Sequence, residues 1–286
     1  MELSRQAILQ DEGIHMIRMF WQRMLPSFLQ SGISPRFAAL FPRICLLCRA
    51  QVEPEYLASG LLCRSCQTDL PLNQTACRCC AEPLTGITNG QVLSEDQDSV
   101  DLLCARCQKQ SPAYERVVAP YLYRYPMSEI IRQFKTRDHL LLNRLLADLL
   151  SVHVLERLEA GAINPPDLIL PVPTHWRTRL RRGFNPAACL ADAVGRQLTL
   201  PVEMDLLRKQ ILTKPQHDLN RAQRLKNLDQ SFGLRDSERI KGRSVALVDD
   251  VVTTASTADV IAALLRDNGA HSVQVWALAR TPYQRR

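Results

Sequence analysis

Four pairs of cysteines, each with two residues between its members, constrain the fold of this 286-residue chain more than any other feature. The eight residues are Cys45, Cys48, Cys63, Cys66, Cys77, Cys80, Cys104 and Cys107. Two thiolates at this spacing can reach one Zn²⁺ from a tight turn, and two such pairs complete a closed tetrahedral site. The sequence therefore predicts two structural zinc ions, whose binding energy contributes to folding.

The order of the cysteines favours sequential pairing. Fourteen residues separate Cys48 from Cys63 and 23 separate Cys80 from Cys104, and both lengths suit a short hairpin between two knuckles. A crossed pairing is also compatible with the sequence. The other alternative is a disulfide framework in an exported protein, but residues 1–13 lack a basic region followed by an apolar run. We therefore expect a cytoplasmic protein that binds zinc.

Composition divides the chain into three parts. Residues 1–44 form an N-terminal extension with an amphipathic helical pattern, and residues 45–110 form a double zinc-ribbon module. From 111 to 286, apolar strands alternate with helical patterns, which predicts an α/β domain with a mainly parallel sheet. The expected strands are 117–123, 168–172, 244–248 and 272–279, and the expected helices are 128–134, 141–152, 187–198 and 259–268. No run of about 18 apolar residues predicts a membrane span.

Two adjacent carboxylates and a Thr/Ser-rich loop follow the strand expected at 244–248. Asp249 and Asp250 would lie at the carboxyl edge of the sheet, where α/β domains bind ligands, and could accept hydrogen bonds from ribose hydroxyls. The loop at 253–257 precedes a helix, whose first N–H groups suit a phosphate dianion. An ordinary turn with Thr254 or Ser256 as N-cap is the alternative, but adjacent buried carboxylates are costly unless they are used. The motif therefore predicts a ribose 5-phosphate site.

Positive charge is concentrated in one segment of the chain, whose formal net charge is +7. Residues 45–107 contain 4 Lys/Arg and 8 Asp/Glu, a net charge of −4, whereas residues 171–243 contain 15 and 7, a net charge of +8. Near Trp176 and Phe184, this segment contains a cluster of four arginines, Arg177, Arg179, Arg181 and Arg182. Such a cluster could bind the phosphates of single-stranded DNA, close over a pyrophosphate as a lid, or form a solvated face.

Several motifs occur together and in order along the chain. The segment 245–257 resembles the signature of the type I phosphoribosyltransferases, which bind phosphoribosyl pyrophosphate. It is accompanied by the segment 41–48, the second cysteine group, Pro171-Val172-Pro173, and the segments 181–185 and 221–227. Over about residues 38–283, this combination resembles the ComF/GntX family of competence-associated proteins. The resemblance implies a double zinc ribbon followed by a type I phosphoribosyltransferase-like α/β domain, and a link to natural transformation or the use of external DNA.

The resemblance also implies roles for individual residues. Asp249 and Asp250 would be the catalytic pair that holds the ribose hydroxyls, and Thr253, Thr254, Ala255, Ser256 and Thr257 would hold the 5-phosphate. The turn formed by Pro171, Val172 and Pro173 would lie at the pyrophosphate, with Mg²⁺ bridging. Ala255 departs from the signature, which usually has glycine there. Glycine permits a positive φ and a close approach of the backbone to phosphate.

Two main functions follow as expectations. The first is an accessory protein of DNA uptake that binds a phosphoribosyl pyrophosphate-type ligand and single-stranded DNA, and that could contact other DNA-uptake proteins. The alternative is an active phosphoribosyltransferase, a glycosyltransferase that joins ribose 5-phosphate to a base or related acceptor. A third candidate is a zinc-ribbon adaptor whose α/β domain is a relic. The sequence contains no recognisable base-reading pocket, so it leaves the acceptor open.

Overall fold

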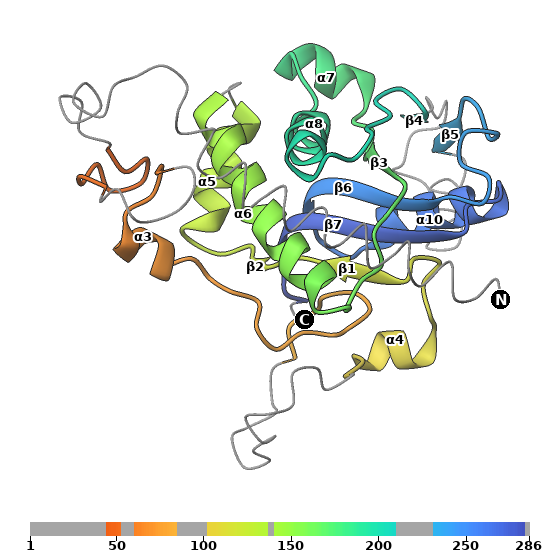
Figure 1. The fold of residues 1–286 in the computed structure, drawn as a ribbon, viewed down its shortest axis with the longest axis horizontal. Coiled ribbons are helices and arrows are strands. Elements are labelled where there is room, and N and C mark those ends of the chain that lie inside the picture. Colours follow the sequence, from red (N-terminus) through yellow and green to blue (C-terminus); the bar gives the residue numbers. More distant parts are fainter. Residues whose placement is uncertain (1–43, 53–59, 85–101, 137–139, 210–230, 284–286) are drawn as a thin grey trace, which may run out of the picture. The chain divides into compact units, whose positions relative to one another are not determined.

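A computed structural model describes residues 44–52, 60–84, 102–136, 140–209 and 231–283 (Figure 1). The chain divides into two compact units, Met1–Asp69 and Leu70–Arg286, which we describe separately. The amphipathic pattern before Ile44 and the motif at 221–227 lie outside the described residues. Among the helices that the structure describes, none is long and apolar enough to cross a membrane.

The first unit contains the first cysteine cluster. A turn after Cys45 returns the chain so that the Cys45 N–H donates to the Ala50 carbonyl at 2.8 Å, and the short helix α3 (Arg64–Thr68) begins directly after Cys63. The four sulfur atoms of Cys45, Cys48, Cys63 and Cys66 lie within 4.8 Å of one another. Four converging thiols are the donor set of a closed structural zinc site, so these residues fit the expected metal.

The second unit is built on a parallel sheet. Its strands are β1 (Arg116–Val118), β2 (Tyr121–Leu122), β3 (Leu168–Pro171), β6 (Ser244–Val252) and β7 (Ser272–Arg280). The spatial order is β1-β7-β6-β3, with β2 also paired to β7, and every pairing is parallel. All nine residues of β7 are buried, as expected for a strand covered on both faces. The parallel α/β domain predicted from the sequence is confirmed.

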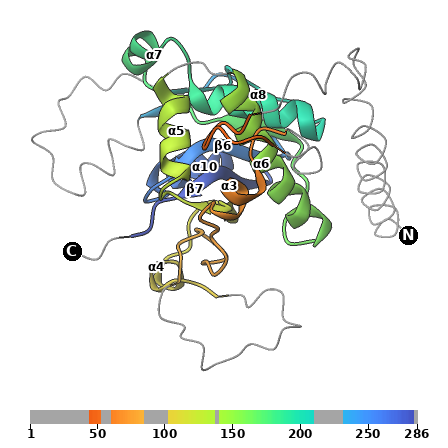
Figure 2. The same cartoon turned by 90° about the vertical axis from the view of Figure 1, so that its left-hand side faces the viewer.

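Helices cover both faces of this sheet. The helix α8 (Pro186–Leu198) packs against α6 (Leu140–Glu159) and lies over β6 in both Figure 1 and Figure 2. The close approach of α8 uses Gly195, since a Cβ there would lie 3.7 Å from the Ile169 side chain and 2.2 Å from that of Val202. The opposite face, which includes Leu168 and Leu170, belongs to the core that also contains residues of α10.

The remaining elements are short or lie at the edges of the unit. They are α4 (Ala105–Lys109), α5 (Met127–Thr136), α7 (Trp176–Arg182), α10 (Ser256–Asp267) and an antiparallel pair formed by β4 (Leu207–Lys209) and β5 (Phe232–Leu234). The start of α8 illustrates how the sequence sets these boundaries. The side chain of Asn185 accepts a hydrogen bond from the Ala187 N–H, and Pro186 occupies the first helical position.

The second cysteine cluster shares the core of the sheet. Cys77, Cys80, Cys104 and Cys107 place their sulfur atoms within 4.8 Å of one another, which completes the sequential grouping that we expected. A hydrogen bond from the Cys80 thiol lowers the pKa of Cys77 to about 4, which is the direction that favours Zn²⁺ binding. Three of these cysteines are buried in the core that includes strands β3, β6 and β7.

The guanidinium group of Arg280, at the end of β7, joins this second ribbon to the sheet. It is 2% exposed, donates from Nε to the Cys80 carbonyl at 3.0 Å and from Nη1 to the Val252 carbonyl at 3.3 Å, and forms an ion pair with Glu82. A buried arginine is tolerated only when its donors are satisfied. The second ribbon and the carboxyl end of β6 are therefore held by one side chain.

The two clusters predict different outcomes when one ligand is removed. Each of Cys63→Ser and Cys107→Ser should reduce the zinc content from about two ions per chain to about one. Cys63→Ser should unfold the ribbon of the first unit and leave the sheet intact. Cys107→Ser should lower the free energy of unfolding of the sheet by at least about 3 kcal/mol, because structural zinc contributes to folding and Cys107 lies in the sheet's own core.

Elemental analysis and hydrogen exchange of the β7 amides measure the two effects. Exchange in β7 should accelerate strongly in Cys107→Ser and stay at the wild-type rate in Cys63→Ser. Equal acceleration in both variants would contradict the assignment of the second cluster to the core of the sheet.

Candidate functional site

The two adjacent aspartates lie where the sheet narrows. Strand β3 ends opposite β6 with Pro171 paired to Val248, and β6 continues beside β7 alone, with Asp249 paired to Ala277. The sequence predicted that β6 ends at residue 248, but it extends to Val252 because β7 continues to supply a pairing partner. The two aspartates of β6 therefore lie beyond the end of the neighbouring strand β3, at the carboxyl edge of the sheet.

Both aspartates lie in a strongly charged environment. Asp250 is 8% exposed, and its Oδ1 lies 2.8 Å from Nζ of Lys135 on α5. The Asp250 N–H donates to Oδ1 of Asp249 at 2.9 Å. Burial and the neighbouring charge of Asp250 raise the pKa of Asp249 to about 7, although Lys135 and Lys209 act in the opposite direction. Such a carboxyl group changes its charge near neutral pH, which is typical of functional sites.

Lys135 and Lys209 were not predicted from the sequence to belong to this site. Lys135 is the basic residue in the last turn of α5, where a lysine commonly only complements the helix dipole. Lys209 lies at the end of β4, with its Nζ 5.5 Å from the centroid of the Phe232 ring. Only the tertiary fold brings these residues near Asp249 and Asp250, so no local pattern in the sequence could have identified them.

The loop after β6 leads directly into α10. Thr253 and Thr254 are exposed, and the Thr254 hydroxyl donates to Oγ of Ser256 at 3.0 Å. The N-cap is Ala255, not Thr254 or Ser256 as the alternative interpretation of the turn required, although the Ser256 N–H donates to Oγ1 of Thr254 at 3.4 Å. The first N–H groups of a helix have no intrahelical partner. At this helix the N-cap residue itself has no side-chain acceptor, which suits a phosphate ligand.

Ala255 adopts the backbone conformation that glycine favours. Its φ is 60° and its ψ is 6°, in the left-handed region, and the residue is 5% exposed. A residue with a Cβ in this region destabilises the fold by roughly 1–2 kcal/mol relative to glycine. Alanine at position 255, where the signature has glycine, therefore still forms the turn but lowers the stability of the fold.

The turn at 171–173 is rigid but offers few hydrogen-bond donors. Proline has no N–H, and the Val172 N–H donates to the Val248 carbonyl at 2.9 Å. The Val172 carbonyl accepts from Nδ2 of Asn185 at 3.1 Å, and Oδ1 of Asn185 accepts from the Thr174 hydroxyl at 2.7 Å. This turn therefore shapes the edge of the site, and Asn185 fixes it to the start of α8.

The arginine cluster lies on α7, which follows this turn. Arg177, Arg179, Arg181 and Arg182 all belong to this helix, and Arg177 and Arg181 are exposed. Trp176 is 42% exposed, and its ring centroid lies 5.3 Å from Cζ of Arg177. Phe184, the other flanking aromatic residue, instead packs on Phe134 at a centroid distance of 6.1 Å. Of these two aromatic residues, Trp176 is the exposed one, and its ring also stacks on that of His175 at a centroid distance of 5.9 Å.

Known proteins resemble the chain over both of its parts. A double zinc ribbon domain matches residues 37–108, and a phosphoribosyl transferase domain matches residues 180–286. DNA utilization protein YhgH of Shigella flexneri is 33% identical over 240 residues, which cover 84% of this chain and 98% of that protein. Competence protein F of Haemophilus influenzae is 32% identical over 237 residues, which cover 82% of this chain and 96% of that protein.

Among solved structures, a purine phosphoribosyltransferase from Pyrococcus horikoshii is 15% identical and aligns with 50% of this chain and 91% of its own at a TM-score of 0.30. The relatives from Shigella and Haemophilus each exceed 30% identity and align over more than four fifths of this chain. The two matched domains follow one another in the order that the motifs predicted. The chain therefore belongs to the ComF/GntX family, with a double zinc ribbon followed by a type I phosphoribosyltransferase-like domain.

Proposed function

We propose that this protein binds a phosphoribosyl pyrophosphate-type ligand at the carboxyl edge of its sheet and acts in the uptake or use of external DNA. The observation that carries the proposal is the sequence of groups along β6 and α10. Two carboxylates are followed within a few residues by a helix N-terminus whose N-cap residue, Ala255, has no side-chain acceptor. Relatives named for competence and for DNA utilization support the biological context.

In this proposal each group has a defined task. Asp249 and Asp250 accept hydrogen bonds from the ribose hydroxyls, and Lys135 partly neutralises the pair so that both can be ionised together. The loop Thr253, Thr254, Ala255, Ser256 and Thr257 holds the 5-phosphate through N–H groups and hydroxyls. The turn Pro171, Val172 and Pro173 bounds the pyrophosphate. Carboxylate oxygens suit Mg²⁺, which would supply charge neutralisation to the pyrophosphate when it is bound.

The alternative is an active phosphoribosyltransferase. In that reaction the bond between ribose C1 and pyrophosphate breaks, positive charge develops on the sugar ring, and an acceptor forms the new bond to C1. The protein would contribute mainly by positioning and by fixed charge. The carboxylate of Asp249, ionised near neutral pH, could stabilise such positive charge.

The second part of the proposal is a track for single-stranded DNA on α7. Arg177 and Arg181 are four residues apart and therefore lie on one helix face. The exposed Trp176 ring, which the Arg177 guanidinium group and the His175 ring both contact, is one on which a base could stack by replacing one of these neighbours. The lid hypothesis uses the same arginines for the pyrophosphate.

The experiment that tests the proposal is calorimetry of the zinc-loaded protein with phosphoribosyl pyrophosphate and Mg²⁺, repeated with single-stranded DNA. Binding of both ligands without release of pyrophosphate would support the accessory role. Release of pyrophosphate that depends on an added base would favour the transferase. Absence of phosphoribosyl pyrophosphate binding would contradict the proposed site.

Replacing both aspartates should abolish ligand binding. The variant with Asp249→Asn and Asp250→Asn should bind phosphoribosyl pyrophosphate at least about 100-fold more weakly, because two charge-assisted hydrogen bonds are lost. Its fold should persist, because asparagine has the size of aspartate and the substitutions remove the repulsion between two adjacent buried carboxylates. The matched control is Asp267→Asn, because Asp267 is exposed and lies at the far end of α10. This variant should bind like the wild type.

The pH dependence of binding provides a check on the same site. Because the pKa of Asp249 is raised to about 7, it is protonated below that pH, so affinity should increase as the pH rises through about 7. The positive charge of Lys135 lowers this pKa, so Lys135→Met should shift the midpoint to higher pH. Calorimetric titrations between pH 5.5 and pH 8.5 measure the midpoint. An unchanged midpoint in Lys135→Met would show that Lys135 does not act on Asp249.

Restoring glycine at the N-cap of α10 should stabilise the protein. Ala255→Gly should raise the free energy of unfolding by about 0.5–1 kcal/mol, since glycine adopts a positive φ without strain. Binding of phosphoribosyl pyrophosphate should stay the same or strengthen. Ala258→Gly, three residues later in the same helix, should instead destabilise by about 1 kcal/mol. Denaturant titration and calorimetry measure both effects, and a clear loss of affinity in Ala255→Gly would contradict the loop geometry.

Replacing the arginine cluster distinguishes the hypothesis of a DNA track from the hypothesis of a lid. Replacement of Arg177, Arg179, Arg181 and Arg182 by Ala should weaken single-stranded DNA binding and reduce the slope of log K against log salt by no more than roughly 3. The affinity for phosphoribosyl pyrophosphate should decrease less than the affinity for single-stranded DNA. The lid hypothesis predicts the reverse order.

The control for this experiment removes the same amount of charge elsewhere. It replaces four exposed basic residues of other elements with Ala, Lys109, Arg157, Arg208 and Lys241. If both variants lose the same DNA affinity, net charge explains the effect. If neither loses any at either of two salt concentrations, the cluster on α7 is a solvated face.

A further inference from the structure

A buried tyrosine, Tyr114, lies in the linker between the second cysteine cluster and the sheet. It is 2% exposed, and its side chain lines the same cavity of about 470 Å³ as Cys79 and Cys107. Its hydroxyl oxygen is itself buried and has no hydrogen-bond partner among the described residues. Such groups are rare in native proteins, because a hydroxyl that leaves water without a new partner destabilises the fold. The hydroxyl of Tyr114 therefore requires an acceptor close to it.

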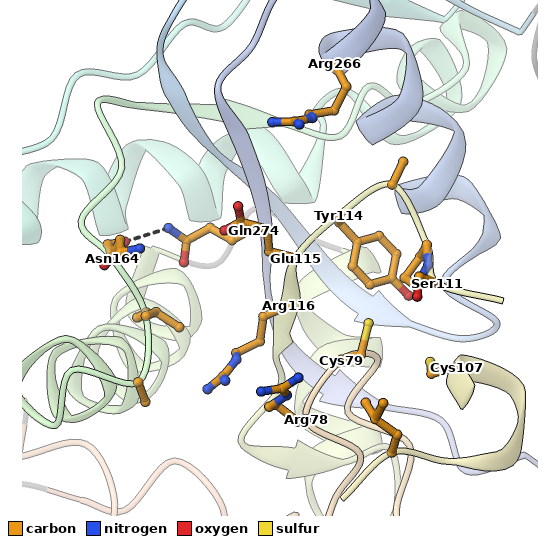
Figure 3. A pocket seen from close by; sticks show the side chains of 15 residues that line it. Arg78, Cys79, Cys107, Ser111, Tyr114, Glu115, Arg116, Asn164, Arg266 and Gln274 are labelled. Carbon is orange, nitrogen blue, oxygen red and sulfur yellow. Dashed lines mark hydrogen bonds between the residues drawn. The ribbon is translucent and has the colours of Figure 1, made fainter. Parts of the chain in front are cut away.

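The groups nearest to this hydroxyl belong to the second cluster. Figure 3 shows the hydroxyl on the side of Ser111 and Cys107. Burial raises the pKa of Tyr114, and negative charge at Cys80, Cys79 and Cys107 acts in the same direction. The hydroxyl therefore keeps its proton, and it lies within electrostatic reach of these sulfur atoms. Of the three cysteines, Cys80 and Cys107 belong to the cluster that fits zinc.

Backbone contacts on both sides of Tyr114 fix the position of its ring. On one side, the Ala113 N–H donates to Oδ1 of Asp259 in the first turn of α10, at 2.8 Å. On the other side, the Glu115 N–H donates to the Val273 carbonyl of β7, also at 2.8 Å. The sheet and α10 therefore hold the tyrosine against the cluster, and its hydroxyl has little freedom to turn toward another acceptor.

Sulfur atoms of this cluster already accept hydrogen bonds from the backbone. The Cys77 sulfur accepts from the N–H groups of Cys79, Cys80 and Cys104. The Cys80 sulfur accepts from the Glu82 N–H. Four thiolates carry more negative charge than one Zn²⁺ neutralises, so a buried site of this kind is stabilised by donors around its sulfur atoms. A buried hydroxyl directed at the cluster supplies one more such donor.

The four sulfur atoms fit a closed zinc site, since they lie within 4.8 Å of one another. Zinc, when it is bound, keeps each of these sulfurs as a thiolate, which accepts hydrogen bonds and donates none. A thiolate is therefore the acceptor that the Tyr114 hydroxyl lacks among neutral groups.

We propose that the Tyr114 hydroxyl donates a hydrogen bond to a zinc-bound sulfur of the second cluster, Cys80 or Cys107, and thereby slows the loss of the metal. Tyr114 is in this role a positioning residue, because it acts on the zinc ion through a ligand. Partners of this kind commonly change metal affinity by about 10- to 100-fold. The proposal rests on the zinc of the second ribbon and does not depend on the phosphoribosyl site.

The first test measures how fast zinc leaves the full-length protein. Zinc-loaded protein is mixed with an excess of a chelator whose absorbance reports the metal that it captures. One of the two zinc ions should leave about 10-fold faster from Tyr114→Phe than from the wild type, and the other at the wild-type rate. The same substitution in the Cys63→Ser variant, which lacks a ligand of the first cluster, assigns the faster ion to the second cluster.

The matched control is Tyr121→Phe. Tyr121 belongs to the same unit and is 3% exposed, but its ring packs on that of His153 at a centroid distance of 5.4 Å. This variant should release both zinc ions at the wild-type rates. Equal acceleration in Tyr114→Phe and Tyr121→Phe would show that a general loss of packing releases the metal, and would overturn the proposal.

The second test detects the hydrogen bond itself and uses Co²⁺ in place of zinc. A hydrogen bond stabilises the sulfur lone pairs, so its loss in Tyr114→Phe should shift the sulfur-to-cobalt charge-transfer bands to longer wavelength. Tyr121→Phe should leave the bands in place. Faster zinc release from Tyr114→Phe with unshifted bands would overturn the hydrogen bond, as it would if the hydroxyl bonded the Cys79 thiol instead. Shifted bands with an unchanged release rate would overturn the role of Tyr114 in retaining zinc.

Discussion

The structure of the second unit depends on one buried guanidinium group, that of Arg280. It bonds the carbonyls of Cys80 and Val252 and pairs with Glu82, so it connects the second zinc ribbon to the ends of the two central strands. An uncompensated charge at this depth would cost several kcal/mol, so these contacts must form together. They form only when the ribbon is folded. The energy of metal binding is therefore transmitted to the carboxyl edge of the sheet, where the candidate site lies.

The same anchoring explains how the loop 253–257 tolerates alanine at position 255. Its entry is fixed because the Val252 carbonyl accepts from Arg280 and from the Thr281 N–H at 2.9 Å. Its exit is fixed because the Ala113 N–H donates to Oδ1 of Asp259 in the first turn of α10, at 2.8 Å. A loop held at both ends has little freedom to relax the left-handed conformation of Ala255. The strain at this residue is thus maintained by contacts outside the loop, as is common at functional sites.

The sequence predicted the features that depend on local spacing. The spacing within each cysteine pair predicts metal binding at any place in the chain. The alternation of apolar strands with helices predicts a parallel sheet. The motif around Asp249 was found because its groups are adjacent in the chain. Lys135 was not found, because more than a hundred residues separate it from Asp250. The burial of Arg280 was not predicted either, since an arginine near the end of a chain is normally solvated and only the ribbon covers it. The extension of β6 to Val252 likewise depends on its neighbour β7.

The second ribbon also covers an edge of the sheet that would otherwise be exposed. Strand β1 is the outer strand beside β7, and its unpaired backbone groups would otherwise offer a template for association. The segment 71–79 covers part of this edge, because the Val117 N–H of β1 donates to the Cys79 carbonyl and the Leu122 N–H of β2 donates to the Pro71 carbonyl, at 2.8 and 2.7 Å. The ribbon also holds Arg280 beside the loop 253–257. Folding of this ribbon therefore both covers an edge of the sheet and holds the carboxyl end, where the candidate site lies.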